Sequence, residues 1–358
     1  MVVDIKNFLA EKKPIIDKVV EKFVNRNITE DSLNFMCGLP SYEYNTEAIQ
    51  KAIADPIWDF LDRGGKRWRP TLFLLLLDAF GFKSEDYYDF VVLPELVHNG
   101  TIMVDDIEDM SEERRGKPCT HKIFGIDIAI NAGYAMAYIP LLSLLKNKGK
   151  LDSKTLIRMY EIYSEELIKV HFGQAMDIAW HNGMANADDL TEKEYMQMCA
   201  FKTGTLARLS AKIAGVLAKR SNEEVKALGK FAETIGIAFQ IQDDILNLSG
   251  EEFAKGKGGL GEDITEGKRS LLIIHTLQKA NSEDRKRLIE ILDMHTVDQK
   301  LRNEAITIMK KYGSIEYAKE KARNMVKDAW RDVDKILPKS EAKEKLKAFA
   351  DYLVDRKI

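Results

Sequence analysis

Residues 93–109 read LPELVHNGTIMVDDIED, a largely apolar segment that ends in acidic residues. Asp105 and Asp109 are four positions apart, so in a helix both carboxylates project from one face. Like charges at this spacing repel each other by roughly a few tenths of a kcal/mol, and a cation would offset that repulsion. Carboxylate oxygens suit magnesium, which keeps several waters and shares phosphate oxygens. The alternative interpretation is a solvated acidic helix end.

The same arrangement recurs at residues 243–247, which read DDILN and follow the apolar run Ile235–Ile241. An amide, Asn247, takes the last position of this second cluster. Two acidic clusters at the ends of two apolar helices favour a shared role in metal binding over coincidence.

Basic residues form a complementary set. The motif GGKRWRP at 64–70 has glycines that let the backbone approach an anion, and a helix is expected to begin near its proline. Lys66 and Arg69 would converge on a phosphate-like group, and the alternative is an ordinary basic turn. A loop arginine pair, Arg114–Arg115, follows the first acidic cluster. Weaker candidates are Lys202–Gly204, the glycine-rich stretch Gly256–Gly261 with Glu262 and Asp263, and Gly267–Lys268.

The remainder of the chain is also helical in pattern. Apolar residues recur mainly at helical spacing, alternating stretches are rare, and only 8 prolines occur among 358 residues. Thr191, with Glu194 three residues later, predicts a helix start of the capping-box type. Hydrophobic residues make up 45% of the chain, enough for a sizeable core. These features predict an all-α protein with a peripheral N-terminal helix and connector at residues 1–40 and a single domain at 41–358.

Charge and cysteine usage argue against several classes of protein. The net charge of −3 is too balanced to predict binding to nucleic acid or to an anionic membrane. Cys37, Cys119 and Cys199 are widely spaced, which indicates neither a disulfide framework nor a zinc site and suits the cytoplasm. Apolar runs such as Leu72–Leu77 are far shorter than the ~20 residues of a bilayer span, so we expect no transmembrane segment.

Acidic and basic motifs set against apolar helices predict a site that binds polyanions at the mouth of an apolar cavity. Its ligand should have a diphosphate head and a hydrocarbon tail. The sequence has no evident Ser/His/Asp or Cys/His nucleophile set. The lack of an obvious catalytic base fits a reaction that is driven by stabilisation of the leaving group.

The motifs resemble those of the trans-isoprenyl diphosphate synthases. The matching pieces, in chain order, are GGKRWRP (64–70), ELVHNGTIMVDDIEDMSEERRGKPCTH (95–121), GQAMD (173–177), KTGTL (202–206), FQIQDDILN (239–247) and EDITEGKRS (262–270). HNGTIMVDDIED, and DDILN followed by EDITEGK, are similar to the eukaryotic-type geranylgeranyl diphosphate synthases in particular. The resemblance implies an all-α bundle around a deep central cavity, usually a homodimer, that condenses isopentenyl diphosphate with an allylic diphosphate.

The resemblance also implies a role for individual residues. Three magnesium ions are implied, held by Asp105 and Asp109 with Asp106 in support, and by Asp243 with help from Asp244. The residues implied to bind the allylic diphosphate are Arg114, Lys202 and Lys268, and those implied to bind isopentenyl diphosphate are Lys66, Arg69, His98 and Arg115. Thr203 and Gln240 would face the developing allylic cation, and Gln174 and Asp177 would line the upper wall.

Two positions depart from the pattern of that family. Asn247 replaces the more usual aspartate, at a position that would support the metal indirectly. Lys257, which would also bind substrate, lies six residues before Asp263, where five is usual.

The length of the product should depend on the path of the hydrocarbon tail below Asp105. Gly100 and Thr101, about one turn down, are small, so no aromatic side chain stops the tail at farnesyl length. The floor is then expected from Tyr134 and Tyr138, four apart on the following helix, and the alternative is that both pack in the core. We predict geranylgeranyl diphosphate as the product, with longer products or farnesyl diphosphate as the alternatives.

Three other classes of protein share some of these features. A class I terpene cyclase would have a DDxxD helix but would lack the isopentenyl site implied by GGKRWRP and the arginine pair. A non-catalytic partner subunit of a synthase would usually lose one of the two aspartate-rich motifs. A helical scaffold with acidic patches would have no reason to keep lysines and arginines at these positions.

Overall fold

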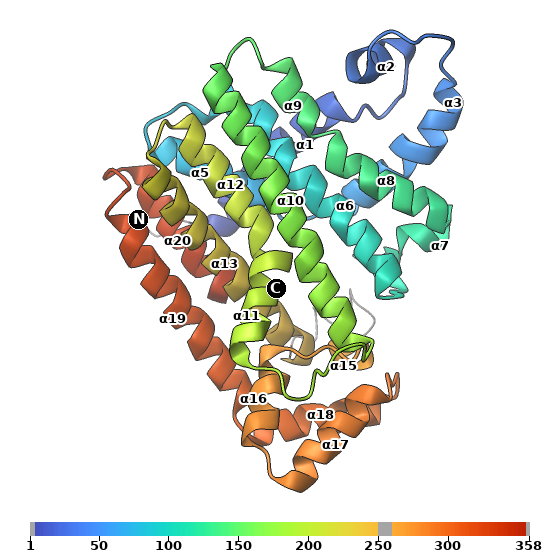
Figure 1. Ribbon diagram of the computed structural model, residues 1–358, viewed down its shortest axis with the longest axis vertical. Helices are drawn as coiled ribbons and strands as arrows, with labels where there is room; N and C mark the ends of the chain where they lie inside the picture. The colour runs from blue at the N-terminus through green and yellow to red at the C-terminus, as the bar shows by residue number, and fades with distance from the viewer. Residues whose placement is uncertain (1–3, 250–259, 356–358) are drawn as a thin grey trace. The chain divides into compact units, whose positions relative to one another are not determined.

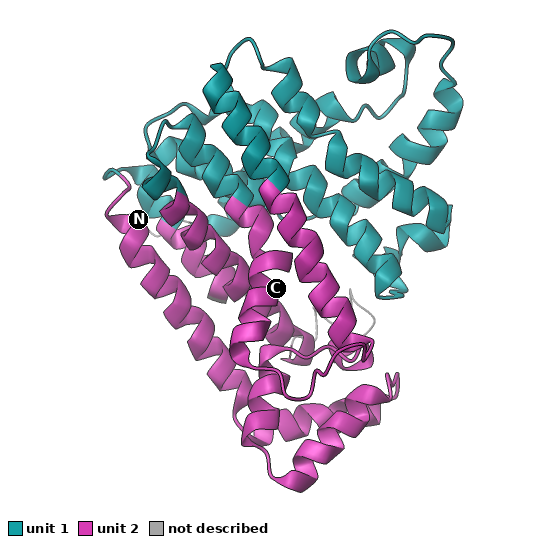
Figure 2. Cartoon of the chain, viewed as in Figure 1, with its two compact units in different colours: residues 1–164, 209–225, 338–346 teal, residues 165–208, 226–337, 347–358 magenta. Residues whose placement is uncertain are grey.

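The computed structural model describes residues 4–249 and 260–355, which are almost entirely helical (Figure 1). The predicted all-α class is confirmed. The chain divides into two compact units, and helices α10 (Ser153–His181), α12 (Gly204–Leu217), α13 (Asn222–Ser249) and α20 (Glu341–Asp355) contribute residues to both. Unit 1 comprises residues 1–164, 209–225 and 338–346, and unit 2 comprises 165–208, 226–337 and 347–358 (Figure 2). The single domain predicted at 41–358 stays a prediction.

Unit 1 contains the helices that precede α10. In chain order they are α1 (Ile5–Phe23), α2 (Glu30–Cys37), α3 (Thr46–Ile49), the π-helical turn η1 (Gln50–Ala54), α4 (Asp55–Asp62), α5 (Trp68–Ala79), the 3₁₀ helix η2 (Ser84–Val91), α6 (Val92–Glu108), α7 (Thr120–Phe124), α8 (Ile126–Tyr138) and α9 (Leu141–Lys146).

The core of unit 1 follows from its apolar helices. Helix α5 is apolar on every side, and each residue from Leu72 to Leu77 is buried. Helices α6 and α8 cross closely, because a Cβ built on Gly100 would lie 2.6 Å from the carbonyl oxygen of Gly133. Helix α1 packs against α5, α6 and η2 and buries five apolar side chains, namely Ile5, Leu9, Ile16, Val20 and Phe23.

A short hairpin in unit 1 interrupts the helical pattern. Strands β1 (Glu113–Arg114) and β2 (Lys117–Pro118) pair antiparallel around Arg115 and Gly116, which have φ values of 56° and 74°. Two successive positive φ angles are typical of a two-residue hairpin turn. Strands of two residues are too short to leave an alternating pattern, so the sequence did not predict them.

Unit 2 contains helices from the middle and the C-terminal part of the chain. Those lying wholly within it are α11 (Glu192–Lys202), α15 (Glu262–Thr265), α16 (Leu271–Lys279), α17 (Ser282–Asp293), α18 (Gln299–Lys311) and α19 (Ser314–Asp334). The predicted capping box begins α11: the amide of Glu194 donates to Oγ1 of Thr191 at 3.2 Å, and the amide of Thr191 donates to Glu194 Oε2 at 2.8 Å.

One described stretch, Ile126–Lys146, is apolar and long enough to cross a membrane by length and composition alone, with a mean hydropathy of 1.6. In this chain it comprises α8 and α9, and 39% of its most apolar window is buried. A core helix of a soluble protein can have the same composition, so the stretch is weak evidence for a membrane span.

Candidate active site

The first acidic cluster lies at the C-terminal end of α6, in unit 1. Asp105 and Asp109 are half-buried there, and the amide of Asp109 donates to the carbonyl of Asp105 at 2.8 Å. Asp106 points inward and is only 1% exposed. The predicted arrangement of Asp105 and Asp109 on one helical turn is therefore present.

Arg114 is held by the buried carboxylate of Asp106. Its Nε donates to Asp106 Oδ1 at 2.7 Å, and its Nη2 lies 2.5 Å from the same oxygen. Burial raises the pKa of Asp106, and the charge of Arg114 opposes that rise. Because Arg114 belongs to strand β1, this pair fixes the hairpin beside the acidic end of α6.

The basic motif at 64–70 forms the entry to α5, where Arg67 has a left-handed φ of 51°. Arg69 is buried, and its Nη1 donates to Nε2 of His98 on α6 at 3.0 Å, because a guanidinium has no acceptor. Burial and the positive charges of Arg69 and Arg115 hold the pKa of His98 well below its usual value. His98 is therefore neutral at pH 7 and keeps Arg69 in place.

Arg115 joins the same region of unit 1. Its Nη1 donates to the carbonyl of Gly64 at 2.7 Å. Burial and the charge of Arg67 lower the pKa of Arg115 to about 10. The structure places Arg69, Arg115 and the neutral His98 in the same part of unit 1. Two guanidinium groups gathered in this way favour a bound anion. Lys66 is half-buried in the same loop.

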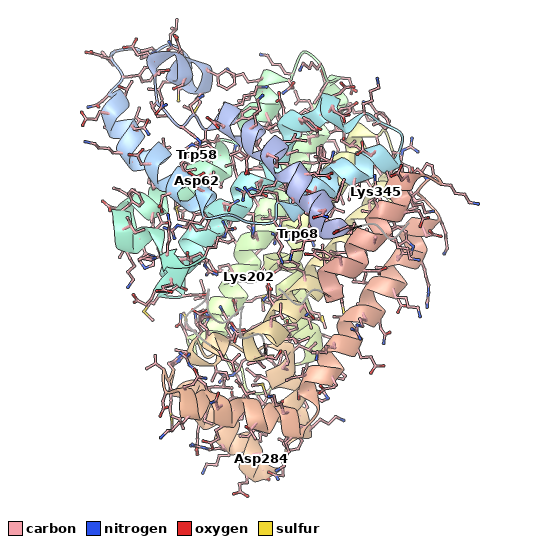
Figure 3. All side chains as sticks on the ribbon, turned by 180° about the vertical axis from the view of Figure 1, so that it is seen from behind. Trp58, Asp62, Trp68, Lys202, Asp284 and Lys345 are labelled. Carbon is pink, nitrogen blue, oxygen red and sulfur yellow. The ribbon has the colours of Figure 1, made fainter. Side chains whose placement is uncertain are left out.

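In unit 2, several predicted site residues lie close to the point where α11 ends and α12 begins. Lys202 ends α11, and its Nζ lies 2.6 Å from Oδ2 of the buried Asp177 on α10 (Lys202 is labelled in Figure 3). The helices approach closely here, since a Cβ on Gly173 would lie 2.3 Å from the backbone nitrogen of Lys202. Only glycine fits at position 173 without moving α11.

A charged cluster supports this break from α12. The guanidinium of Arg208 donates through Nε to Glu166 at 2.6 Å and through Nη1 to Glu233 at 2.5 Å. The same Nη1 lies 3.1 Å from the carbonyl oxygen of Ala200, in the last turn of α11. Arg208 and Glu166 are buried, so the cluster ties α10, α11, α12 and α13 together next to Lys202 and Thr203.

A chain of hydrogen bonds runs from Thr203 to the second acidic cluster. Thr203 Oγ1 donates to Gln240 Oε1 at 2.9 Å, and Gln240 Nε2 donates to Asp244 Oδ1 at 2.8 Å. The hydroxyl of Tyr195 donates to Asp244 Oδ2 at 2.7 Å. Each of these groups therefore has a fixed orientation.

Asp244 lies close to two other carboxylates, so its surroundings favour a bound cation. Burial, followed by the negative charges of Asp263 and Asp243, raises its pKa to about 8. A nearby divalent cation would offset that charge, so these carboxylates fit magnesium. In the described part of the chain, no three His, Cys, Asp or Glu side chains are placed to hold a metal ion by themselves. Magnesium commonly binds through one or two carboxylates together with water and phosphate oxygens.

Asn247 joins the end of α13 to the start of α15. Its Oδ1 accepts from the backbone nitrogen of Asp263 at 3.3 Å, and its carbonyl accepts from Gly261 at 2.9 Å. A carboxylate oxygen could accept the same bond, so the amide at this position leaves the local fold intact. Lys268 follows α15 and forms an ion pair with Glu266.

A model of the polyprenyl synthetase family matches residues 50–309. The chain belongs to the polyprenyl synthetase family. The predicted prenyltransferase class is thus confirmed at the level of the family.

Individual relatives of this polyprenyl synthetase agree with that placement. A short chain isoprenyl diphosphate synthase of Methanothermobacter thermautotrophicus is 34% identical over 322 residues, which is 88% of this chain and 96% of the relative. A geranylgeranyl pyrophosphate synthase of Aspergillus fumigatus is 35% identical over 258 residues, or 72% and 67% of the two chains. The crystal structure of geranylgeranyl pyrophosphate synthetase from Pyrococcus horikoshii superposes with a TM-score of 0.82 at 32% identity, covering 98% of each chain. Archaeal and fungal relatives match this chain at similar identity.

The residues predicted to set product length in this polyprenyl synthetase lie on α6 and α8. Gly100 is required by the close crossing of these helices, and Thr101 Oγ1 donates to the carbonyl of His98 at 3.0 Å. Tyr134 and Tyr138 are 53% and 68% exposed. Neither ring packs in the core of unit 1, and a role as a floor would need another surface to cover them. The influence of all four residues on chain length stays a prediction.

Two further residues were predicted to line or bind the substrate, Gln174 and Lys257. Gln174 is half-buried on α10 beside Gly173. Lys257 lies outside the described residues.

Sequence reasoning missed Tyr195 and named Asp263 only among the weaker candidates. Tyr195 lies seven residues before Lys202 on α11, a spacing that places both on one helical face, and this periodicity was the available signal. Asp263 lies within the motif EDITEGKRS, but nothing in its spacing shows that its charge acts on Asp244.

Proposed function

We propose that this polyprenyl synthetase condenses isopentenyl diphosphate with an allylic diphosphate and that its main product is geranylgeranyl diphosphate. The observation that carries the proposal is the bond from Thr203 Oγ1 to Gln240 Oε1, extended by Gln240 to Asp244. It fixes the orientation of the Thr203 hydroxyl and of the Gln240 amide, whose oxygens would stabilise an allylic cation in this proposal. The geranylgeranyl product is favoured by the names of relatives in Aspergillus and Pyrococcus.

The proposal assigns a role to each of the basic and polar residues. Lys66, Arg69, His98 and Arg115 bind isopentenyl diphosphate, and Arg114, Lys202 and Lys268 bind the allylic diphosphate. Thr203 and Gln240 face the reacting carbon. Gln174 and Asp177 border this polar region. Asp177 also holds the ammonium of Lys202.

The metal requirement belongs to the same proposal. Asp105, Asp109 and Asp243 would hold magnesium, three ions in all, with Asp106 and Asp244 in support. When bound, magnesium supplies charge that stabilises the departing diphosphate. The chain's own contribution is to keep these carboxylates in place, through Arg114 at Asp106 and through Tyr195 and Gln240 at Asp244.

We also propose that the protein forms a homodimer and works in the cytoplasm. Helix α8 exposes Tyr134, Tyr138 and Ile126, each more than half accessible. Large exposed apolar side chains on one helix often mark an interface, and a second copy covering them would supply the surface that the predicted floor needs. The three cysteines are free thiols, which suits a reducing compartment.

Turnover of labelled isopentenyl diphosphate with an allylic primer tests the proposed reaction. The proposal expects a prenyl diphosphate product in the presence of magnesium and none when the metal is chelated. A terpene cyclase would instead convert the allylic diphosphate alone, and a non-catalytic subunit would convert neither substrate.

A further inference from the structure

Helix α1 lies before residue 50, where the match to the polyprenyl synthetase family begins, yet it contacts the basic loop of unit 1. Asp17 on α1 accepts a hydrogen bond from Nε of Arg67 at 2.7 Å through Oδ1. Arg67 is 4% exposed and follows Lys66 in the motif GGKRWRP. A residue of the N-terminal helix thus pairs with a buried cation in the loop assigned to the isopentenyl diphosphate.

Arg67 extends this contact to the rest of the loop. Its Nη1 lies 3.0 Å from Glu95 Oε1 and 3.1 Å from the carbonyl oxygen of Gly64, and its Nη2 donates to the carbonyl of Leu61 at 3.2 Å. These bonds tie the Arg67 side chain to the backbone at Leu61 and at Gly64, the first of the two glycines. The position of Lys66 and Arg69 therefore depends on where the guanidinium of Arg67 lies.

The same network reaches Arg115. Glu95 Oε1 also accepts from Nδ2 of Asn99 at 2.7 Å, and Oδ1 of Asn99 lies 3.4 Å from Nη2 of Arg115. Arg115 in turn donates to the carbonyl of Gly64. Arg67 and Arg115 thus hold the same carbonyl group, and a shift of one guanidinium would move the other.

The charges explain why a second carboxylate is needed. On α6, Glu95 is the acidic partner of Arg67 and is 2% exposed, whereas the guanidinium groups of Arg69 and Arg115 lie in the same part of unit 1. A buried guanidinium close to other cations is unfavourable unless its charge is neutralised. Asp17 supplies the second carboxylate that neutralises Arg67.

We propose that Asp17 is a positioning residue that holds Arg67, and through it the loop Gly64–Arg69 and Arg115, in the geometry that binds the diphosphate of isopentenyl diphosphate. This inference rests on the proposed function, which assigns that diphosphate to Lys66, Arg69, His98 and Arg115. It gives the N-terminal helix a role in substrate affinity.

A simpler reading treats Asp17 as half of a surface ion pair. Its Oδ2 lies 2.5 Å from Nζ of Lys13, one turn earlier on α1. Pairs of this kind contribute little. The variant Lys13→Met removes this pair but keeps the bond to Arg67, so it is a matched control for Asp17→Asn.

The experiment compares Asp17→Asn, Asp17→Glu and Lys13→Met with the wild type in the full chain. Steady-state kinetics give kcat and the KM for each substrate. Calorimetry in EDTA gives the Kd for inorganic pyrophosphate, a probe that needs no turnover, and Lys66→Met shows how much of that affinity comes from the loop. Thermal melting followed by circular dichroism shows whether each variant folds.

Asp17→Asn should raise the KM for isopentenyl diphosphate by about tenfold and weaken pyrophosphate binding similarly. Its kcat and allylic KM should stay within about twofold, Asp17→Glu should restore most of the affinity, and Lys13→Met should behave as wild type. An unchanged isopentenyl KM, or an equal loss in both KM values and kcat, overturns the inference. Absence of wild-type turnover would contradict the proposed function instead. In that case, pyrophosphate binding that is weaker in Asp17→Asn than in the wild type supports the inference, and equal or undetectable binding overturns it.

Discussion

The hydroxyl of Tyr195 donates a 2.7 Å hydrogen bond to Oδ2 of Asp244, and both residues are buried. Gln240 occupies the other oxygen of the same carboxylate. Asp244 is thus fixed by side-chain donors at both oxygens, and its neighbour Asp243 is the residue that we assign to direct metal binding. These two hydrogen bonds hold the Asp244 side chain in place beside the proposed metal ligand.

Replacing Tyr195 by Phe should lower kcat by about tenfold and raise the magnesium concentration needed for half-maximal activity. The variant keeps the ring but removes a hydrogen bond to a charged group. Rate measurements across a magnesium titration check this prediction. Tyr317→Phe is the matched control, because the hydroxyl of Tyr317 also donates to a carboxylate, that of Glu192. Equal behaviour of the two variants would show that Asp244 needs no such support.

Asp105→Ala and Asp243→Ala should each lower turnover by several orders of magnitude, because each removes charge stabilisation of the departing diphosphate. Single-turnover rates at saturating substrate measure the effect. Glu113→Ala, an exposed acidic residue of β1, should stay near wild type. Near-normal rates in both aspartate variants would rule out the metal assignment.

Lys66→Ala and Arg69→Ala should raise the KM for isopentenyl diphosphate far more than that for the allylic substrate. Arg69 also bonds to His98, so its loss should have the larger effect. Initial rates with each substrate varied in turn give both constants. Equal increases in both would mean that the two diphosphate positions are assigned wrongly.

Thr101→Phe should shorten the product, because it places an aromatic ring one turn below Asp105. Position 101 is the better test site, since a side chain at Gly100 would collide with the backbone of α8. Thr101→Val serves as the control for loss of the hydroxyl. Chromatography of the dephosphorylated products gives the chain-length distribution, and an unchanged distribution would place the tail elsewhere.

Tyr138→Ala should lengthen the product, because it shortens a side chain of the predicted floor. Tyr138→Asp should weaken the proposed dimer, because the Tyr138 ring is 68% exposed on α8 and would be covered by the second copy. Sedimentation equilibrium measures the second effect and product analysis the first. A monomeric wild type would contradict the dimer. An unchanged product in Tyr138→Ala would remove this residue from the floor.

The sequence was sufficient for the fold class and for the placement of Asp105 and Asp109 on one helical turn. Helical periodicity and the four-residue spacing of Asp105 and Asp109 are local properties, and local properties can be read from the chain. The contact between Asp177 and Lys202 was not predicted, although both residues were named. It joins different helices at a glycine, and only tertiary packing sets that distance.

The exposure of Tyr134 and Tyr138 and the placement of Asp17 were beyond sequence reasoning for related reasons. Periodicity assigns residues to a helical face but does not say what covers that face. Asp17 pairs with a residue fifty positions away, and a charge in an amphipathic helix is ordinarily read as solvated.

The most direct test of the central claim is the mass of the product formed from isopentenyl and farnesyl diphosphates in the presence of magnesium. Geranylgeranyl diphosphate, formed only when both substrates and the metal are present, is the predicted result. A cyclic hydrocarbon, or no condensation product with this primer or with shorter allylic primers, would contradict the account.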